Sequence, residues 1–205
     1  MKKTLAALVL TATVLLPAVA GCSSNESVSS AVSESDTQSY RGTEFVSEPK
    51  EVGPPKWSVV KPDGWTPGGM ILPGIDDILT LQTPKTATAL GSMDFAGFSA
   101  KNAPDPGLSA ADFLQMEVDA MTAPASGADR STRPTTVGGY EAMIIESRQE
   151  LFEGVWSRSK STGVVVPRTD GKGLAIVVLT TSTSDKADQQ LIDDVEQLHS
   201  TIKIL

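Results

Sequence analysis

The chain has one cysteine, Cys22, which follows directly after the most apolar segment of the sequence. A single cysteine excludes an intramolecular disulfide, so the fold has to be stabilised by a hydrophobic core. Before Cys22, Lys2 and Lys3 form a short basic stretch, and residues 5–20 are largely apolar. This order is typical of a secretory signal. Because Pro17 interrupts an apolar run already shorter than the roughly 20 residues that a membrane span needs, a transmembrane helix is the weaker interpretation.

The last four residues of this segment resemble the lipobox of bacterial lipoproteins. They are Val19, Ala20, Gly21 and Cys22, and they match the lipobox at every position. The resemblance implies cleavage between Gly21 and Cys22, a diacylglyceryl group on the thiol and an acyl chain such as palmitate on the new amino group. Two or three acyl chains give stable anchoring. Cys22 is therefore expected to anchor the chain at the outer face of the cell membrane, and an ordinary secretory signal with an incidental cysteine is the alternative.

The charge balance excludes several classes of partner. The chain carries 17 basic and 25 acidic residues, a formal net charge of −8. Removal of residues 1–21 takes away Lys2 and Lys3 and no acid, which leaves 15 basic residues and a net charge of −10. Nucleic-acid backbones are bound by clustered Lys and Arg, so we expect no nucleic-acid partner. A polybasic contact with anionic lipids is also not expected, which leaves the covalent lipid as the membrane attachment.

Three regions are expected along the chain: a signal peptide at residues 1–21, the lipidated Cys22 with a flexible Ser-rich linker at residues 22–53, and a globular domain at residues 54–205. The linker begins with SSNESVSSAVSESDTQS, residues 23–39, which contains no Lys or Arg. Its few apolar side chains cannot offset the entropy of ordering. The remaining segment is long enough to form one core.

Hydrophobic periodicity within residues 54–205 predicts an α+β fold, an antiparallel sheet of about five to six strands packed with two or more helices. One helix is expected over residues 108–121, where Ser109 can cap it and Asp112 takes the third helical position. A closing amphipathic helix is expected to begin near residue 184. Strands are expected within residues 56–65, 76–84, 92–100, 140–152, 155–167 and 174–183, the last of them central to the sheet.

The layout as a whole resembles the LpqN-like lipoproteins of mycobacteria and related actinobacteria, whose domain is similar to the PsbP-like α/β sandwich. The resemblance rests on the lipobox, the Ser-rich spacer, a W-x-V-x-x-P-x-G-W stretch from Trp57 to Trp65, a mid-chain helix, a β-meander and a closing helix. It covers essentially the whole chain, and its most specific mark is the turn from Pro62 to Trp65. It implies a cell-envelope location, a non-enzymatic role and contact with envelope glycolipids or the proteins that move them.

No catalytic, metal or cofactor site is expected. His199 is the only histidine and is interpreted as a surface residue near the end of the last helix. Ser157 and Lys160 match the S-x-x-K pattern of penicillin-recognising enzymes, but residues three apart on a strand face opposite sides of a sheet. A small serine hydrolase or a penicillin-binding activity is therefore a remote alternative. The adjacent acid pairs lack the alternation of a calcium loop, and no nucleotide-binding motif occurs.

The candidate ligand-binding residues are aromatic: Trp57, Trp65, Tyr140 and Trp156. Core packing is the first interpretation of these side chains, and a groove for an acyl chain or a sugar is the second. The first functional hypothesis is a non-catalytic envelope lipoprotein that binds an amphiphilic lipid or glycolipid or assists its export machinery. The alternative is a protein-interaction module that is tethered to the membrane and meets a partner in the envelope.

Overall fold

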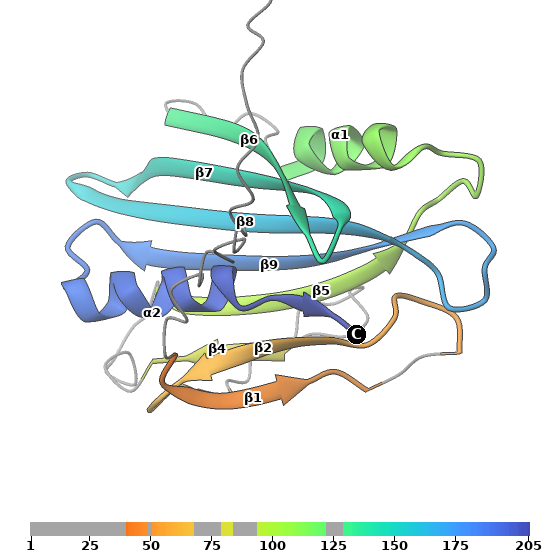
Figure 1. Cartoon of the computed structure of the whole chain (residues 1–205). Helices are drawn as coiled ribbons and strands as arrows, with labels where there is room; N and C mark the ends of the chain where they lie inside the picture. The colour runs from red at the N-terminus through yellow and green to blue at the C-terminus, as the bar shows by residue number, and fades with distance from the viewer. Residues whose placement is uncertain (1–39, 49–50, 68–78, 84–93, 122–128) are drawn as a thin grey trace, which may run out of the picture. The chain divides into compact units, whose positions relative to one another are not determined.

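The structure is a computed structural model and describes residues 40–48, 51–67, 79–83, 94–121 and 129–205 (Figure 1). Its helices and strands all lie in one unit, Ser39–Leu205. The predicted signal peptide and Cys22 lie outside the described residues, so the lipid anchor stays a prediction. The expected linker at residues 22–53 is too long at its end, because residues 42–46 already form a strand of the folded unit.

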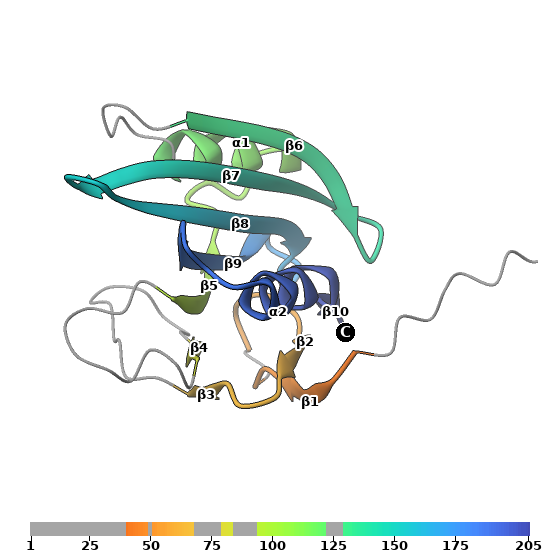
Figure 2. The ribbon, with the colours of Figure 1, turned by 90° about the vertical axis from the view of Figure 1, so that its left-hand side faces the viewer.

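Within the described residues, seven antiparallel strands form the larger sheet, in the order β3-β4-β5-β9-β8-β7-β6. They follow one another in this order from the bottom to the top of Figure 2. Their bounds are Thr66–Pro67 for β3, Leu79–Gln82 for β4, Phe95–Asn102 for β5, Asp129–Val137 for β6, Tyr140–Phe152 for β7, Val155–Pro167 for β8 and Leu174–Ser184 for β9. β9 lies between β5 and β8, which confirms the predicted central strand.

A smaller sheet of three described strands has the order β1-β2-β10, with β1 at Gly42–Val46, β2 at Trp57–Pro62 and β10 at Lys203–Ile204. β2 is antiparallel to both neighbours. It ends at the predicted turn, where Gly64 has a φ of +83° and the Trp65 N–H donates to the Pro62 carbonyl at 3.3 Å. A positive φ at this position is one that glycine adopts without a steric penalty.

The first of the two described helices, α1 (Ala110–Met121), confirms the predicted cap. The Asp112 N–H donates to Ser109 Oγ at 3.1 Å, and the Ser109 hydroxyl donates to the Asp112 carboxylate at 2.7 Å. The second helix, α2 (Gln189–Ser200), begins later than expected, because Asp188 accepts the Leu191 N–H at 3.0 Å and caps it. A side-chain acceptor at this position satisfies one of the free N–H groups of the first turn.

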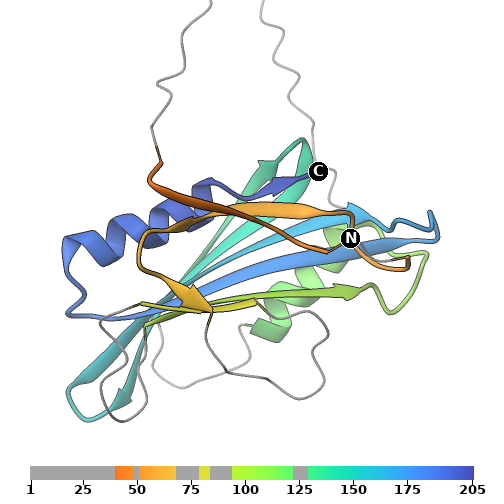
Figure 3. The same ribbon diagram turned by 90° about the horizontal axis from the view of Figure 1, so that it is seen from below.

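The elements form three layers, and Figure 3 shows β1, β2 and α2 side by side in front of the long strands. α1 packs on the opposite face of the larger sheet, against β7 and β8. The main core lies between the two sheets and α2, and Trp57 stacks on Phe98 there with ring centroids 4.8 Å apart. Burial of each large apolar side chain contributes roughly 1.5–3 kcal/mol. This core fixes α2 along the face of the larger sheet.

The predicted α+β class, an antiparallel sheet packed with two helices, is confirmed, although the strands divide between two sheets. β6 is absent from the expected strands, because its sequence DRSTRPTTV is polar and contains Pro134. Proline is tolerated in edge strands, and β6 is the terminal strand of its sheet. Within the described part of the chain, neither helix has the length and apolar composition that crossing a membrane requires.

Candidate functional site

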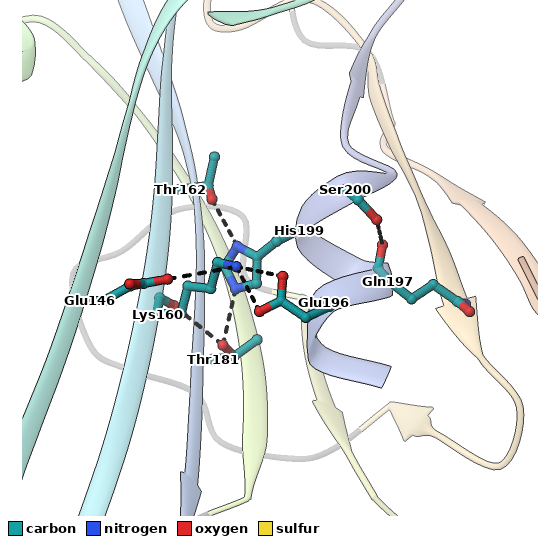
Figure 4. Close-up of polar contacts among 8 residues, drawn as sticks. All are labelled: Glu146, Lys160, Thr162, Thr181, Glu196, Gln197, His199 and Ser200. Carbon is teal, nitrogen blue, oxygen red and sulfur yellow. Dashed lines mark hydrogen bonds and ion pairs between the residues drawn. The ribbon is translucent and has the colours of Figure 1, made fainter. Parts of the chain in front are cut away.

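A groove of about 490 Å³ lies between α2 and the strands β6, β7, β8 and β9, and we call it the α2 groove. Figure 4 shows the part of it where α2 faces β8 and β9. Its lining is mostly charged and hydroxyl-bearing, with two aliphatic side chains from α2. The lining residues are Asp129, Arg130, Ser131, Glu146, Ser147, Arg148, Arg158, Ser159, Lys160, Thr181, Thr183, Ile192, Val195 and Glu196.

The register of β7 and β8 places the charged side chains on one face. Glu146 lies opposite Lys160, and Arg148 lies opposite Arg158. Because side chains alternate between faces along a strand, these four residues project from the same face of the sheet. Lys160 and α2 are joined across the groove, so this is the face that α2 covers. The sheet therefore presents two neighbouring rows of charge to the helix.

Lys160 joins the sheet to the helix. Its Nζ donates to both carboxylate oxygens of Glu196 on α2, at 2.8 and 2.7 Å. Glu146 on β7 lies on the other side, with its nearest carboxylate oxygen 3.8 Å from the same Nζ. The Lys160 side chain is only 13% exposed, whereas those of Glu146 and Glu196 are 53% and 60% exposed. One enclosed ammonium thus lies between two carboxylates that water reaches.

Asp185 binds two arginines next to the α2 groove. Arg148 donates from Nη2 at 2.8 Å and from Nε at 3.3 Å, and Arg158 donates from Nε at 2.7 Å. The hydrogen bonds from Arg148 and Arg158 lower the pKa of Asp185 to about 2. The bond to Asp185 also raises the pKa of Arg148 above its ordinary value. Arginines directly opposite on neighbouring strands repel each other, so Asp185 offsets a cost of this register.

His199 is buried, which corrects its interpretation as a surface residue. It is 8% exposed, and its two ring nitrogens lie 2.8 Å from Thr162 Oγ1 and 3.0 Å from Thr181 Oγ1. Since the Thr181 hydroxyl donates to the Lys160 carbonyl, it accepts from His199 Nε2, and Thr162 donates to Nδ1. Burial, and to a lesser degree the charge of Lys160, lower the pKa of His199 to about 3. The ring is therefore neutral and has no nitrogen available to a ligand.

The aromatic candidates occupy different surroundings. Trp57 and Trp65 are 4% and 1% exposed and belong to the main core, as the first interpretation had it. Trp65 also donates its indole N–H to Asp194 on α2 at 2.8 Å. Tyr140 is half-buried after the β6–β7 turn, where it packs against the core. Trp156 is half-buried beside the α2 groove, with the Arg148 guanidinium 4.3 Å from its ring centre.

The S-x-x-K pair does not form a nucleophile and base. Ser157 Oγ lies 3.0 Å from Ser182 Oγ on one face of the sheet, whereas Lys160 binds Glu196 on the other. The two side chains are therefore separated by the sheet, as the strand geometry predicted. Among the described residues, no group of three or more His, Cys, Asp and Glu side chains is placed to hold a metal ion.

The sequence interpretation missed the charged cluster of the groove, although it considered Lys160 in another role. Glu146, Arg148, Arg158 and Lys160 follow one another at a spacing of two on two strands joined by a hairpin. Charges at this spacing on paired strands share one face, which is the signal that was available. Asp185 gave no such signal, because it lies after β9 and reaches the arginines only through the turn that leads to α2.

No family model matches the chain, and no curated protein matches its sequence. Solved structures with the same fold include the following two. LpqN, described as involved in cell envelope biogenesis of Mycobacterium tuberculosis, has a TM-score of 0.56 and 16% identity over 78% of this chain and 90% of LpqN. The cyanobacterial PsbP of Synechocystis sp. PCC 6803 has a TM-score of 0.51 and 12% identity over 80% of this chain and 92% of that protein. The domain is thus LpqN-like and PsbP-like in fold, as the sequence layout had indicated.

Proposed function

We propose that this protein is a non-catalytic lipoprotein of the cell envelope, which binds an amphiphilic lipid or glycolipid in the α2 groove. The location is supported by the match of Val19 to Cys22 to a lipobox. It is supported further by LpqN, a protein of cell envelope biogenesis with the same fold. In this proposal the lipid on Cys22 holds the folded unit at the outer face of the membrane, close to the source of its ligand.

The observation that carries the ligand class is the composition of the groove. Charged and hydroxyl-bearing side chains on the sheet can bind a polar head group, whereas Ile192 and Val195 on α2 offer apolar contact at the opposite wall. Ile192 is 38% exposed, so its apolar surface is accessible. The sheet wall is thus polar, and the helix wall combines these aliphatic side chains with the carboxylate of Glu196, which suits a molecule with polar and apolar parts.

A binding role is supported also by the state of the residues that could have acted in catalysis. Both nitrogens of His199 are engaged by threonine hydroxyls, and its low pKa opposes proton transfer near neutral pH. Lys160 is held by Glu196 and is separated from Ser157 by the sheet. A general base within reach of a nucleophile is therefore not found among the described residues of the groove.

The anchor is tested by labelling cells with a palmitate analogue and separating membranes from the medium. The full chain is expected to carry the label and to stay with the membrane, whereas a Cys22→Ala variant loses the label. A Ser24→Ala variant keeps both properties and serves as the control. Unlabelled wild-type protein that is recovered from the medium would contradict the proposed anchor.

The ligand is tested by native mass spectrometry of the mature chain, residues 22–205, mixed with lipids extracted from the envelope. One or more lipids are expected to bind with a fixed stoichiometry. Glu196→Gln in the groove should reduce the bound fraction, whereas Lys172→Ala in the exposed turn after β8 should not. If no envelope lipid binds, and cross-linking in cells instead captures one protein, the alternative of a tethered protein-interaction module is favoured.

A further inference from the structure

We infer that the α2 groove selects a zwitterionic head group, in which a phosphodiester and a primary ammonium are joined by a short bridge, as in an ethanolamine phospholipid. This inference rests on the proposed function, because it names the head group of the amphiphile that the groove is proposed to bind. The charges that line the groove carry it. They form two rows, one with two arginines and one with two carboxylates around Lys160, and the Ser147–Ser159 pair of β7 and β8 lies between the rows.

The first row offers guanidinium nitrogens to the phosphate. Arg148 and Arg158 lie directly opposite each other, and Asp185 accepts from Nε of both and from Nη2 of Arg148. Within the described residues, the two terminal nitrogens of Arg158 have no hydrogen-bond partner, and its side chain is 61% exposed. A guanidinium with free terminal N–H groups matches the geometry of phosphate oxygens.

The second row offers carboxylates to the ammonium. Glu146 and Glu196 flank Lys160 from the sheet and from α2, so this row has one positive and two negative charges. The Glu146 carboxylate lies 3.8 Å from Lys160 Nζ, beyond hydrogen-bond distance, and its oxygens accept no hydrogen bond from another described residue. An added ammonium would therefore bring the row to neutrality and find free acceptors.

The two rows are close enough for one small head group. Arg158 and Lys160 are two residues apart on β8, a separation of about 6.7 Å along the strand. Their side chains project from the same face, and those of Arg158 and Glu146 are long and mostly exposed. The two-carbon bridge of ethanolamine phosphate can span this separation once the side chains turn toward the ligand.

The fixed charges favour a zwitterion over an anion or a neutral sugar. Asp129 lies opposite Arg148 on β6, and together with Asp185 it offsets the charge of the two arginines. An anionic head group can bind the terminal nitrogens of Arg158 at the first row, but it is repelled by Glu146 at the second. A neutral head group satisfies hydrogen bonds but gains no charge complementarity at either row. A zwitterion gains at both.

The test compares three soluble amphiphiles on the mature chain, residues 22–205, by titration calorimetry below their micelle concentrations. They are dihexanoyl phosphatidylethanolamine, dihexanoyl phosphatidylglycerol and octyl glucoside, which carry a zwitterionic, an anionic and a neutral head group. The ethanolamine lipid is expected to bind about tenfold more tightly than either of the others, since two charge-assisted hydrogen-bond sites are filled. The indole N–H resonance of Trp156, beside Arg148, should shift on binding.

Two variants separate the rows. Glu146→Gln should weaken binding of the ethanolamine lipid about tenfold and leave the glycerol lipid unchanged or slightly tighter, whereas Arg158→Gln should weaken both. Lys172→Ala, in an exposed turn, is the control that changes neither. The comparison of the three amphiphiles on the wild-type chain needs no variant and therefore stands even if one of the variants misfolds.

The outcomes distinguish this inference from the proposed function. If octyl glucoside or the glycerol lipid binds as tightly as the ethanolamine lipid, the zwitterionic head group is wrong, whereas an amphiphile-binding groove is retained. The same holds if Glu146→Gln leaves binding of the ethanolamine lipid unchanged. If none of the three amphiphiles binds, and envelope extracts also yield no bound lipid, both the inference and the proposed function fail.

Discussion

The ammonium of Lys160 on β8 lies 2.7 Å from the Glu196 carboxylate on α2, so one ion pair connects the sheet to the helix across the α2 groove. The pair combines an enclosed cation with an exposed anion, and such pairs contribute less than their short distance implies. The ion pair contributes to function by positioning α2 and its carboxylate. It keeps α2 at a fixed separation from β8, and it holds one carboxylate at the mouth of the groove.

A double-mutant cycle measures this coupling. Lys160→Met and Glu196→Gln, alone and combined, are expected to give a coupling free energy of about 0.5–1 kcal/mol in urea unfolding at low salt. The coupling should decrease as salt is added, because the carboxylate is exposed. The same cycle with Glu146, whose carboxylate is 3.8 Å away, should give a smaller value. A coupling near zero for Glu196 at low salt would show that the contact does not hold the helix.

His199 predicts a pH dependence of stability in mildly acidic solution. In the unfolded chain it binds a proton as the pH falls below about 6.5, whereas in the fold its pKa is about 3. The unfolded state therefore binds more protons in this window, and the free energy of unfolding decreases by up to about 1.4 kcal/mol per pH unit as the pH falls. The contribution of His199 is complete above the unfolded pKa and is lost progressively toward pH 3.

Urea unfolding between pH 7 and pH 4.5 checks this expectation, because most carboxylates titrate below that range. A His199→Gln variant can still bond to Thr162 and Thr181 but carries no titrating ring. It should show a flatter pH profile than the wild type, whatever its stability at neutral pH. Equal profiles for the two proteins would contradict a buried neutral histidine.

Asp185 predicts a second, more acidic transition. Its pKa is about 2 in the fold, below the ordinary value of 3.8, because it accepts hydrogen bonds from Arg148 and Arg158. A lowered carboxyl pKa stabilises the fold above about pH 4, and this contribution is lost as the pH falls through 2. Asp185→Asn should therefore be less stable than the wild type at neutral pH, and the difference should shrink between pH 4 and pH 2. A side-chain carboxyl resonance of Asp185 that titrates near 3.8 would contradict the arrangement.

Local sequence signals were sufficient for the elements that local chemistry determines. The cap of α1 depends on Ser109 and Asp112, three residues apart, and the turn after β2 depends on Gly64, whose φ is +83°. β1 was not predicted, because its sequence, GTEFV, is short and its pairing partner, β2, is more than ten residues away. A strand of this kind is stabilised by its partner and not by its own propensity.

The candidate site was harder to predict for the same reason. Trp57 and Trp65 are conspicuous in the sequence, but large aromatic side chains contribute to a core more often than to a binding site. The burial of His199 depends on Thr162 and Thr181, which reach it from two strands. Only the packing of those strands against α2 reveals that the helix places the imidazole of His199 there and the carboxylate of Glu196 three residues earlier.

Pro134 on the outer edge of β6 opposes self-association of the chain through this strand. The β6–β7 turn consists of Gly138 and Gly139, whose φ values of +58° and +84° correspond to a two-residue type I′ turn. In such a hairpin the flanking residues, Val137 and Tyr140, form a hydrogen-bonded pair. Hydrogen-bonded and non-hydrogen-bonded pairs then alternate along the two strands, so that Pro134 and Met143 form a non-hydrogen-bonded pair. Pro134 falls on a position whose backbone points away from β7. It therefore costs no bond within the sheet, and it removes a donor from the exposed edge.

We expect Pro134→Thr to restore this donor and to promote pairing of β6 with a second copy of the chain. Edge strands without proline or charge at such positions are templates for strand addition. The variant should sediment partly as a dimer at concentrations where the wild type does not, while its unfolding midpoint changes little. A second substitution, Thr136→Pro, places a proline at the next outward position, because Thr136 lies two residues along the same edge. It should return the protein to the behaviour of the wild type. If Pro134→Thr leaves sedimentation unchanged, the edge is protected by something other than this residue.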